Sequence, residues 1–363
     1  MSFKLKQYTA PDFSKPEFVN APEAKMEPAP KDTVAPEHFH AMSIFPEYFK
    51  VNGEWLLAAE SRMDCVPVYK DGVIHVVEPR NLHQGDMVIT GRTEDASEGI
   101  FVHPYGFEEG GKLSETFAFR TGRSRETAFS KDYDEIYDLL KYEKDNGYVV
   151  WVMGPAFAFD SDARRAFSAL IDNGYCDALL AGNALATHDL EGAYIGTALG
   201  QDIYTQENMP NGHYNHLDTL NRARLRGSLA EFIKEDHIDN GIMYSLEKNN
   251  IPYILAGSIR DDGPLPPVYA NVYEAQNAMR SHVRRATTVI CMATTLHTIA
   301  TGNMTPSFRM TPDGTIRQVY FYCVDIAEFA VNKLADRGSL SSRGIVTNVQ
   351  DFIVNVAKGV GVM

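Results

Sequence analysis

The sequence predicts an α/β protein in which a parallel, doubly wound sheet follows a small β-rich domain. From about residue 148 onward, short and continuously apolar runs alternate with amphipathic segments of helical length. Before that point, short runs of β-branched and aromatic residues are separated by turn residues. Continuous apolar strands between amphipathic helices are typical of a parallel sheet covered on both faces. A length of 363 residues is compatible with two domains.

Three regions follow from these patterns. Residues 1–42 are rich in proline and predict an extended arm, either disordered or wrapped around a neighbouring subunit. Residues 43–130 predict the small β-rich domain, with Lys70-Asp71-Gly72 as a hairpin turn. Its expected strands lie in EWLLAAES, CVPVYKDGVIHVVEP, DMVITG, GIFVHPY and ETFAFRT. Residues 131–363 predict the α/β domain, which begins with an amphipathic connecting helix over 132–146.

Strands and helices of the α/β domain alternate along the chain. The expected strands are 148–153, 178–181, 251–256, 288–292, 319–324 and 344–347. The expected helices lie near 162–173, 189–199, 219–248, 271–286, 327–337 and 349–358.

Composition excludes several classes of function. The formal net charge of −14 argues against a general nucleic-acid binder, which needs a basic face to neutralise phosphates. The longest apolar run, 149–159, is too short to span a bilayer, and the first residues contain no apolar signal core. The four cysteines form no C-x-x-C pair, so we expect buried, reduced thiols, no zinc site and a cytoplasmic protein.

Residues directly after the expected strands are the first candidates for a binding site. Ligands of open α/β sheets bind beyond the carboxyl ends of the strands. Small residues there let a backbone approach a ligand closely, and helix starts favour phosphate oxygens. An acid at a strand end suits a ribose diol, although helix capping is an equally common use. These features together favour a dinucleotide crevice built from Gly154, Pro155, Asn183, Ala184, Gly257, Ser258, Ala293, Thr294, Thr295, His297 and Asp325. The common G-x-G-x-x-G fingerprint is missing, because the first strand is followed by G-P-A-F-A-F.

Two polar clusters and one charged corner are the candidates for chemistry. The first cluster holds His188, Asp189 and Glu191, and the second holds His213, His216 and Asp218. Three interpretations of them remain open, namely a polar substrate pocket, histidines that only support loops, and a metal site. The basic run Arg222, Arg224 and Arg226 predicts a solvated helix face or a carboxylate grip. The corner SIRDDGP, which holds Arg260, Asp261 and Asp262, is either a ligand site or a salt-bridged turn.

At these residues the sequence resembles a known family. The segments are AGNALATHDLEGAYIGTALG, NGHYNHLDTLNRARLRGS, ILAGSIRDDGPLPPV, ATTLHTIATGN, NKLADRGS and GIVTN. They resemble the lysine-oxoglutarate reductase/saccharopine dehydrogenase (LOR/SDH) conserved-region family. Within it, they are similar to archaeal NAD-dependent ornithine cyclodeaminases and to the C-terminal part of cyanobacterial arginine dihydrolase/ornithine cyclodeaminase proteins. The resemblance spans residues 33–355 and implies a deoxyhypusine-synthase-like NAD fold. Two segments depart from the family pattern, Phe157 to Asp160 and Asn211 to His216.

The resemblance implies NAD-dependent cyclodeamination of L-ornithine to L-proline and ammonia, with a hydride held transiently by bound NAD. The amino-acid substrate needs acidic or basic groups for its amines and a cation for its carboxylate. The acid and base candidates are His188, Asp189, Glu191, Asp261 and Asp262. Arg260 is the candidate carboxylate clamp, and Asp64 is expected to close over the site from the β-rich domain. We expect no metal and a homo-oligomer.

Three other functions compete with this one. The first is a net NAD-dependent oxidoreductase of amino acids, which would release free NADH. The second is an aminobutyl transferase on another diamine, with Lys333 as the candidate nucleophile. The third is a non-catalytic NAD-binding regulatory subunit, which would bind NAD without amine turnover.

Overall fold

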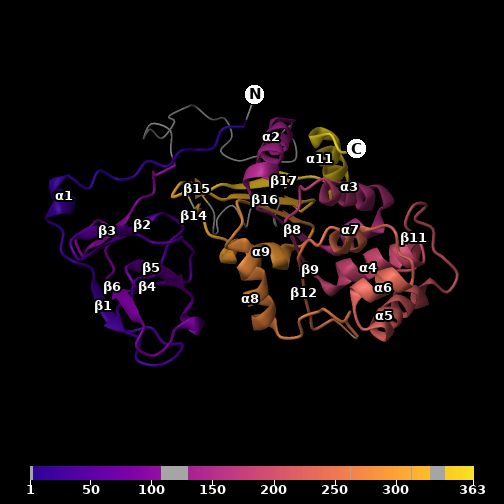
Figure 1. The fold of residues 1–363 in the computed structure, drawn as a ribbon, viewed down its shortest axis with the longest axis horizontal. Helices are drawn as coiled ribbons and strands as arrows, with labels where there is room; N and C mark the ends of the chain where they lie inside the picture. Colours follow the sequence, from indigo (N-terminus) through magenta and orange to yellow (C-terminus); the bar gives the residue numbers. More distant parts are fainter. Residues whose placement is uncertain (1–2, 108–129, 262, 312, 328–339) are drawn as a thin grey trace.

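Antiparallel strands near the N-terminus and a six-stranded parallel sheet form the two parts of the molecule (Figure 1). The structure is a computed structural model that describes residues 3–107, 130–261, 263–311, 313–327 and 340–363. No helix among these residues is long and apolar enough to cross a membrane. The parallel sheet and the antiparallel strands confirm the predicted combination of an α/β domain with a smaller β-rich region.

Among the described residues, seven strands of the N-terminal part form two antiparallel sheets, ordered β1-β6-β4-β5 and β3-β2-β7. They are β1 (Lys25–Pro28), β2 (Glu47–Val51), β3 (Glu54–Leu57), β4 (Val66–Lys70), β5 (Val73–Val77), β6 (Met87–Thr90) and β7 (Ile100–Val102). Asp71 and Gly72 join β4 to β5 with φ values of 51° and 82°, as the hairpin prediction requires. Strand β2 is an addition to the prediction, and ETFAFRT lies outside the described residues.

The expected arm belongs to the fold of its own chain along much of its length. The short helix α1 (Pro16–Val19) precedes β1, which pairs with β6 in antiparallel fashion. Phe13 stacks on Trp55 at 5.2 Å between ring centroids, and Lys50 Nζ donates to three carbonyls at the end of α1. Residues 25–28 thus complete a sheet of the β-rich part, although the sequence assigned them to the arm. The domain boundary at residue 42 stays a prediction.

The parallel sheet has the strand order β12-β9-β8-β13-β16-β17. Its strands are β8 (Val149–Met153), β9 (Ala178–Gly182), β12 (Tyr253–Ala256), β13 (Thr288–Met292), β16 (Tyr320–Asp325) and β17 (Ser342–Val346). Each one starts and ends within two residues of its predicted range. Numbered along the chain, the order is 3-2-1-4-5-6, which is the order of dinucleotide-binding doubly wound sheets.

Helices cover both faces of this sheet (Figure 1). Trp151, Met153 and Leu179 point to the face under α2 (Ser130–Asn146), α3 (Ser161–Asp172) and α11 (Val349–Val360). The alternate residues, such as Val150 and Val152, point to the face under α8 (Val272–Val283) and α9 (Thr295–Met304). Burial on both faces explains why these strands are continuously apolar.

Several helices differ from their predictions. The helix expected at 189–199 is α4 (Asn183–Tyr194), which begins directly after β9. The single helix expected at 219–248 is three helices, α5 (Asn215–Arg226), α6 (Leu229–Glu235) and α7 (Ile242–Lys248). Two glycines with positive φ mark the breaks. Gly227, with φ +88°, ends α5, and Gly241, with φ +103°, directly precedes α7. Helix α9 is an addition to the predicted helices, and its threonines have weak helix propensity. The helix expected at 327–337 lies almost wholly outside the described residues.

Shorter elements complete the fold. They are the 3₁₀ turns η1 (Pro79–Asn81), η2 (Pro155–Phe159) and η3 (Gly212–Tyr214), and the strand pairs β10 (Thr197–Ala198) with β11 (Gln201–Asp202) and β14 (Phe308–Met310) with β15 (Ile316–Gln318). All four cysteines are free and buried, as expected.

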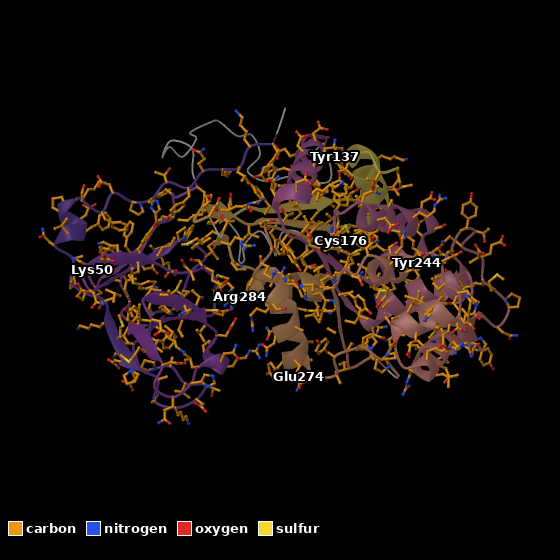
Figure 2. All side chains as sticks on the ribbon, in the orientation of Figure 1. Lys50, Tyr137, Cys176, Tyr244, Glu274 and Arg284 are labelled. Atoms are coloured by element: carbon orange, nitrogen blue, oxygen red, sulfur yellow. The ribbon has the colours of Figure 1, made fainter. Side chains whose placement is uncertain are left out.

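Ion pairs join the two parts of the molecule. Arg284 Nε lies 3.1 Å from a Glu60 carboxylate oxygen, and Arg280 Nε lies 2.7 Å from Glu78 Oε1. Figure 2 shows Arg284 on the side of α8 that faces the antiparallel strands. Arg62, which is fully buried, bridges Glu60 and Glu78 within the β-rich part. The β-rich part is thus anchored to the helix α8, which packs beside β12.

Candidate active site at the carboxyl edge of the parallel sheet

The centre of the candidate site lies where β8 and β13 run side by side. The chain leaves β8 for η2 and α3, and it leaves β13 for α9 on the other face of the sheet. Gly154 N donates to Met292 O at 2.9 Å, and a Cβ at Gly154 would lie 1.9 Å from Ala293 O. Only glycine fits between these two strand ends. Such a reversal of strand order is where doubly wound sheets bind dinucleotides.

The residues predicted to bind a cofactor lie along this edge. Gly154 and Pro155 follow β8, and Asn183 and Ala184 begin α4 after β9. The others follow the ends of β12, β13 and β16, namely Gly257, Ser258, Ala293, Thr294, Thr295, His297 and Asp325. Because the strand ends are in register, the structure brings the predicted set together at one edge.

His297 reaches across the centre of this edge. Its Cε1 atom lies 3.2 Å from the position that a Cβ on Gly182 would take. His297 starts from α9 after β13, and Gly182 ends β9, so the imidazole passes over the end of β8. Burial lowers the pKa of His297, which favours the neutral ring at neutral pH.

Two further features of the edge suit a nucleotide. The first turn of α9 is exposed at Thr295 and Leu296, and free N–H groups at a helix start favour phosphate oxygens. Asp325 Oδ1 accepts a hydrogen bond from Ala327 N at 2.8 Å. Its other oxygen has no partner in the part of the chain that the structure describes. That oxygen is therefore free to accept a hydroxyl.

The charged corner after β12 is a loop with a closed neck. Gly257 N donates to Tyr269 O, and Tyr269 N donates to Leu255 O, both at 2.9 Å. Inside the loop, Asp261 Oδ2 accepts from Ser258 N at 2.7 Å. Arg260 is exposed at the outer end of this turn, and Asp262 lies outside the described residues. The loop can thus present charge to a ligand without burying it.

Asn183 holds this loop against the start of α4. The residue is 8% exposed, and its Oδ1 accepts from Leu265 N at 3.0 Å and from Thr187 Oγ1 at 3.3 Å. The oxygen predicted to meet a cofactor is therefore used within the protein. Its role in the site is to fix where residues 257–265 lie.

His188 and Glu191 form a buried dyad on α4. His188 Nδ1 lies 3.0 Å from Glu191 Oε2. Glu191 also accepts from Thr197 Oγ1 at 2.7 Å, Leu199 N at 3.0 Å and Gly200 N at 3.0 Å. Burial opposes ionisation of Glu191, but these hydrogen bonds outweigh it and lower its pKa. The dyad leaves His188 Nε2 without a partner among the described residues, as a group able to exchange a proton.

The surroundings of the dyad include the second predicted cluster. The His188 ring lies 5.4 Å from Phe159 of η2 and 6.3 Å from His216, between ring centroids. His216 Nδ1 is buried without a hydrogen-bond partner among the described residues. Thr197, which links Glu191 to Asn215 Nδ2 at 2.9 Å, gave no signal in the sequence. Within the described ranges, no three His, Cys, Asp or Glu side chains gather as a metal site would require.

Asp189 faces the opposite way from this dyad. It is fully buried, and its carboxylate accepts from Arg164 Nε at 2.8 Å, Ile242 N at 3.0 Å and Met243 N at 2.8 Å. These bonds cap the start of α7 and join α3, α4 and α7. Every one of these partners belongs to the helical layer, so these contacts give Asp189 a structural role, and its catalytic role stays a prediction.

Asp64 stands apart from the rest of the predicted set. It is an exposed residue with φ +61° between β3 and β4, and it makes no hydrogen bond or ion pair with any residue that the structure describes. The expectation that it closes over the site stays untested by these contacts.

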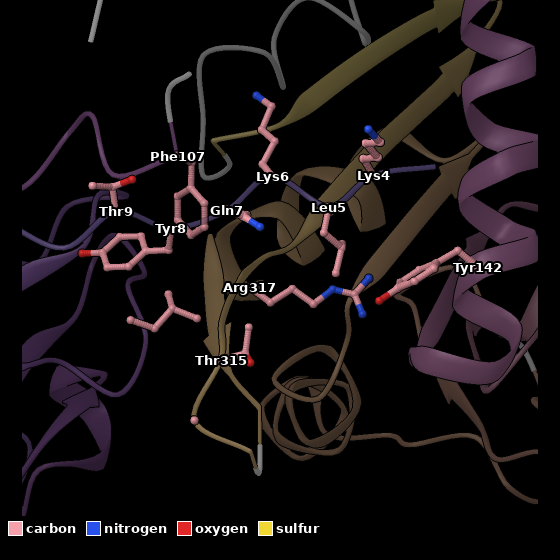
Figure 3. Close-up of a pocket in the computed structure, with 12 residues that line it drawn as sticks. Lys4, Leu5, Lys6, Gln7, Tyr8, Thr9, Phe107, Tyr142, Thr315 and Arg317 are labelled. Carbon is pink, nitrogen blue, oxygen red and sulfur yellow. The ribbon is translucent and has the colours of Figure 1, made fainter. Parts of the chain in front are cut away.

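A large hollow of the described surface lies elsewhere (Figure 3). Its volume is about 980 Å³, and its lining includes Lys4, Lys6, Tyr142 and Arg317. Phe3 packs on both Tyr142 and Tyr320, and Tyr320 begins β16, so this hollow adjoins the opposite edge of the sheet. The strand order, rather than the size of a cavity, therefore locates the candidate site.

Comparison with known proteins identifies the family. The family described as "Arginine dihydrolase ArgZ-like, C-terminal, Rossmann fold" matches residues 135–356. An ornithine cyclodeaminase of Methanopyrus kandleri is 38% identical over 343 residues, which cover 94% of this chain and 79% of the relative. A bifunctional arginine dihydrolase/ornithine cyclodeaminase, AgrE of Nostoc, is 34% identical over 342 residues, which cover 91% of this chain and 46% of that protein.

Solved structures agree with these relationships. A LOR/SDH protein of Methanococcus maripaludis superimposes with a TM-score of 0.84 at 35% identity, covering 93% of this chain and 98% of that one. AgrE in its ternary complex with ornithine and NAD⁺ gives a TM-score of 0.58 at 32% identity, covering 94% of this chain and 46% of that one. The chain therefore belongs to the ArgZ-like C-terminal family and is an enzyme related to the archaeal ornithine cyclodeaminases.

Proposed function

We propose that this protein converts L-ornithine into L-proline and ammonia, with NAD as a bound and regenerated cofactor. The observation that supports this most strongly is the reversal of strand order between β8 and β13, with Gly154 against Ala293 at its centre. The relatives named ornithine cyclodeaminase and the AgrE complex with ornithine and NAD⁺ supply the substrate and the cofactor.

The residues at the edge fit a nicotinamide dinucleotide. At Gly154 and Gly182 a Cβ would meet Ala293 O at 1.9 Å and His297 Cε1 at 3.2 Å, so glycine lets the groups of this edge lie close together. The start of α9 offers N–H groups to phosphate, and one carboxylate oxygen of Asp325 has no partner among the described residues and could bind a ribose hydroxyl. Bound NAD would accept the hydride from Cα of ornithine and later return it to the cyclic product. The reaction is balanced, because ornithine equals proline plus ammonia and no net oxidation occurs.

The protein's own groups would manage charge and protons. His188 Nε2, with Nδ1 held by Glu191, is the candidate that removes a proton from the attacking amine. Asp261 and Asp262 are the candidates that bind an ammonium group, and Arg260 is the candidate that the sequence offers for the carboxylate. Closure by Asp64, assembly as a homo-oligomer and a cytoplasmic location remain expectations of this proposal.

Product analysis tests the proposal. Purified protein is incubated with L-ornithine and NAD⁺, and proline and ammonia are measured by mass spectrometry and a coupled assay while absorbance reports free NADH. We expect equal amounts of proline and ammonia without accumulating NADH. Accumulating NADH would indicate a net oxidoreductase instead. Bound NAD without amine turnover would indicate a regulatory subunit.

Lys333, the nucleophile of the transferase alternative, lies outside the described residues.

A further inference from the structure

Two of the three arginines on α5 are held by a single carboxylate. Arg222 Nε lies 2.7 Å from Asp236 Oδ1, and Arg226 Nε lies 2.8 Å from Asp236 Oδ2. Arg226 also pairs with Glu235. These contacts fasten α5 to the end of α6. They explain the presence of Arg222 and Arg226 in the basic run, but not that of Arg224.

Arg224, between them, points to the loop after β12. Its Nη1 atom lies 3.1 Å from the position that a Cβ on Gly263 would take. Arg224 is exposed, and it has no hydrogen bond or ion pair with any residue of the described ranges. A side chain at position 263 would cover the guanidinium, whereas glycine, with φ +145°, leaves it open. The helix thus presents an unused guanidinium to the charged corner.

This corner is held at the mouth of the candidate site. Asn183, the first residue of α4 at the carboxyl end of β9, binds Leu265 N two residues beyond Gly263. Leu265 is buried, so the contact fixes this side of the loop. The guanidinium of Arg224 therefore lies beside the loop that carries Asp261, in reach of a ligand that enters over the edge of the sheet.

We propose that Arg224 binds the α-carboxylate of the amino-acid substrate. This inference rests on the proposed function and adds the residue that recognises the substrate class. Guanidinium groups bind carboxylates through paired N–H donors, and no residue of the described ranges occupies those donors of Arg224. Asp261 Oδ2 is already bonded to Ser258 N, which limits its competition for the arginine. Arg260, the clamp predicted from sequence, sits at the exposed outer turn beside Ile259, which is fully exposed.

Equilibrium binding to NADH-loaded protein tests this assignment, because NADH accepts no hydride and ornithine then binds without turnover. The probes are L-ornithine and L-ornithinamide, which differ in the charge of one group, measured by isothermal titration calorimetry. We expect Arg224→Gln to weaken ornithine binding roughly 10- to 150-fold, the range for a hydrogen bond to a charged group. Ornithinamide binding should stay unchanged, and Arg224→Lys should restore part of the ornithine affinity.

Arg222→Gln is the matched control, since it removes the same charge from the same helix while Arg226 still holds Asp236. It should leave ornithine binding unchanged. The assignment is overturned if Arg224→Gln still prefers ornithine to ornithinamide as the wild type does, or if only Arg260→Gln loses that preference. A wild-type protein that does not distinguish the two probes would overturn the proposed function as well.

Discussion

At the scale of single residues, the His188–Glu191 dyad is the part of the site whose chemistry is most directly set by its contacts. Four hydrogen bonds converge on the Glu191 carboxylate and hold it ionised despite its burial. An ionised carboxylate on Nδ1 fixes the orientation of the imidazole and leaves Nε2 to face a substrate. This arrangement explains why a histidine and a carboxylate lie three residues apart on one side of α4.

His188→Gln and Glu191→Gln should each lower kcat for proline formation about 10²- to 10⁴-fold, the usual contribution of general acid–base catalysis. His83→Gln, at a side chain 82% exposed in the β-rich part, is the control and should leave kcat unchanged. Steady-state kinetics with mass-spectrometric detection of proline checks this. Wild-type kcat in His188→Gln would remove the dyad from the chemistry.

Asp189 gives the opposite prediction although it adjoins His188 in sequence. Asp189→Asn should lower the free energy of unfolding by about 3–5 kcal/mol, because it leaves the buried Arg164 without its partner. Urea denaturation measures this change. A variant that keeps wild-type stability and loses turnover would support the catalytic role that the sequence alone favoured.

At the scale of elements, the junction of β8 and β13 is the feature on which the crevice depends. Gly154→Ala would force a Cβ against Ala293 O, so the two strand ends must separate. We expect a loss of at least about 2 kcal/mol in unfolding free energy, within the range for overpacking, together with weaker NAD binding. Gly53→Ala is the control at an open turn with φ +83°, and its cost should stay near 1 kcal/mol with NAD binding intact. Equal NAD affinity in both variants would show that the junction does not shape the cofactor site.

The elements also show how far sequence patterns reach. All six parallel strands could be predicted, because burial on both faces makes each one a continuous apolar run bounded by turn residues. Helix α9 could not be predicted, since its threonines have weak helix propensity and its stability comes from packing with α8 and β8. The start of α4 was placed six residues late, because the strand–helix junction at Gly182 and Asn183 carries no strong capping signal.

At the scale of the whole molecule, a buried ionic network fixes the β-rich part beside the parallel sheet. Burial opposes ionisation of Glu78, but the charge and hydrogen bond of Arg62, together with Arg280, outweigh it and lower its pKa to about 2. Because the folded pKa lies below the ordinary value of 4.5, this group stabilises the fold above pH 4.5. That contribution disappears as the pH falls through about 2.

Glu78→Gln should therefore be less stable than the wild type at neutral pH, and the difference should shrink between about pH 4.5 and pH 2. Urea unfolding at a series of pH values measures it. The matched control is Glu94→Gln, at an exposed carboxylate of the same part that makes no hydrogen bond or ion pair with a residue that the structure describes, and it should leave the free energy of unfolding unchanged. A pH-independent difference in Glu78→Gln would contradict the ionic account of this interface.

Only part of the candidate site could be predicted from the sequence. The residues after strand ends could be found, because parallel strands bring their carboxyl ends to one edge. The partners of those residues could not, since Asn183 meets Leu265 across 82 positions and Arg224 meets Gly263 across 39. Likewise, no local sequence pattern distinguishes the role of Glu191, which belongs to the dyad, from that of Asp189, which caps α7.

The central claim is that one bound NAD takes a hydride from the substrate and returns it to the product. L-Ornithine deuterated at Cα tests this most directly, with proline analysed by mass spectrometry and NMR. The account predicts that proline keeps the deuterium at Cα, because the hydride never leaves the closed site. Proline that carries solvent hydrogen at Cα, or deuterium recovered in free NADH, would contradict it.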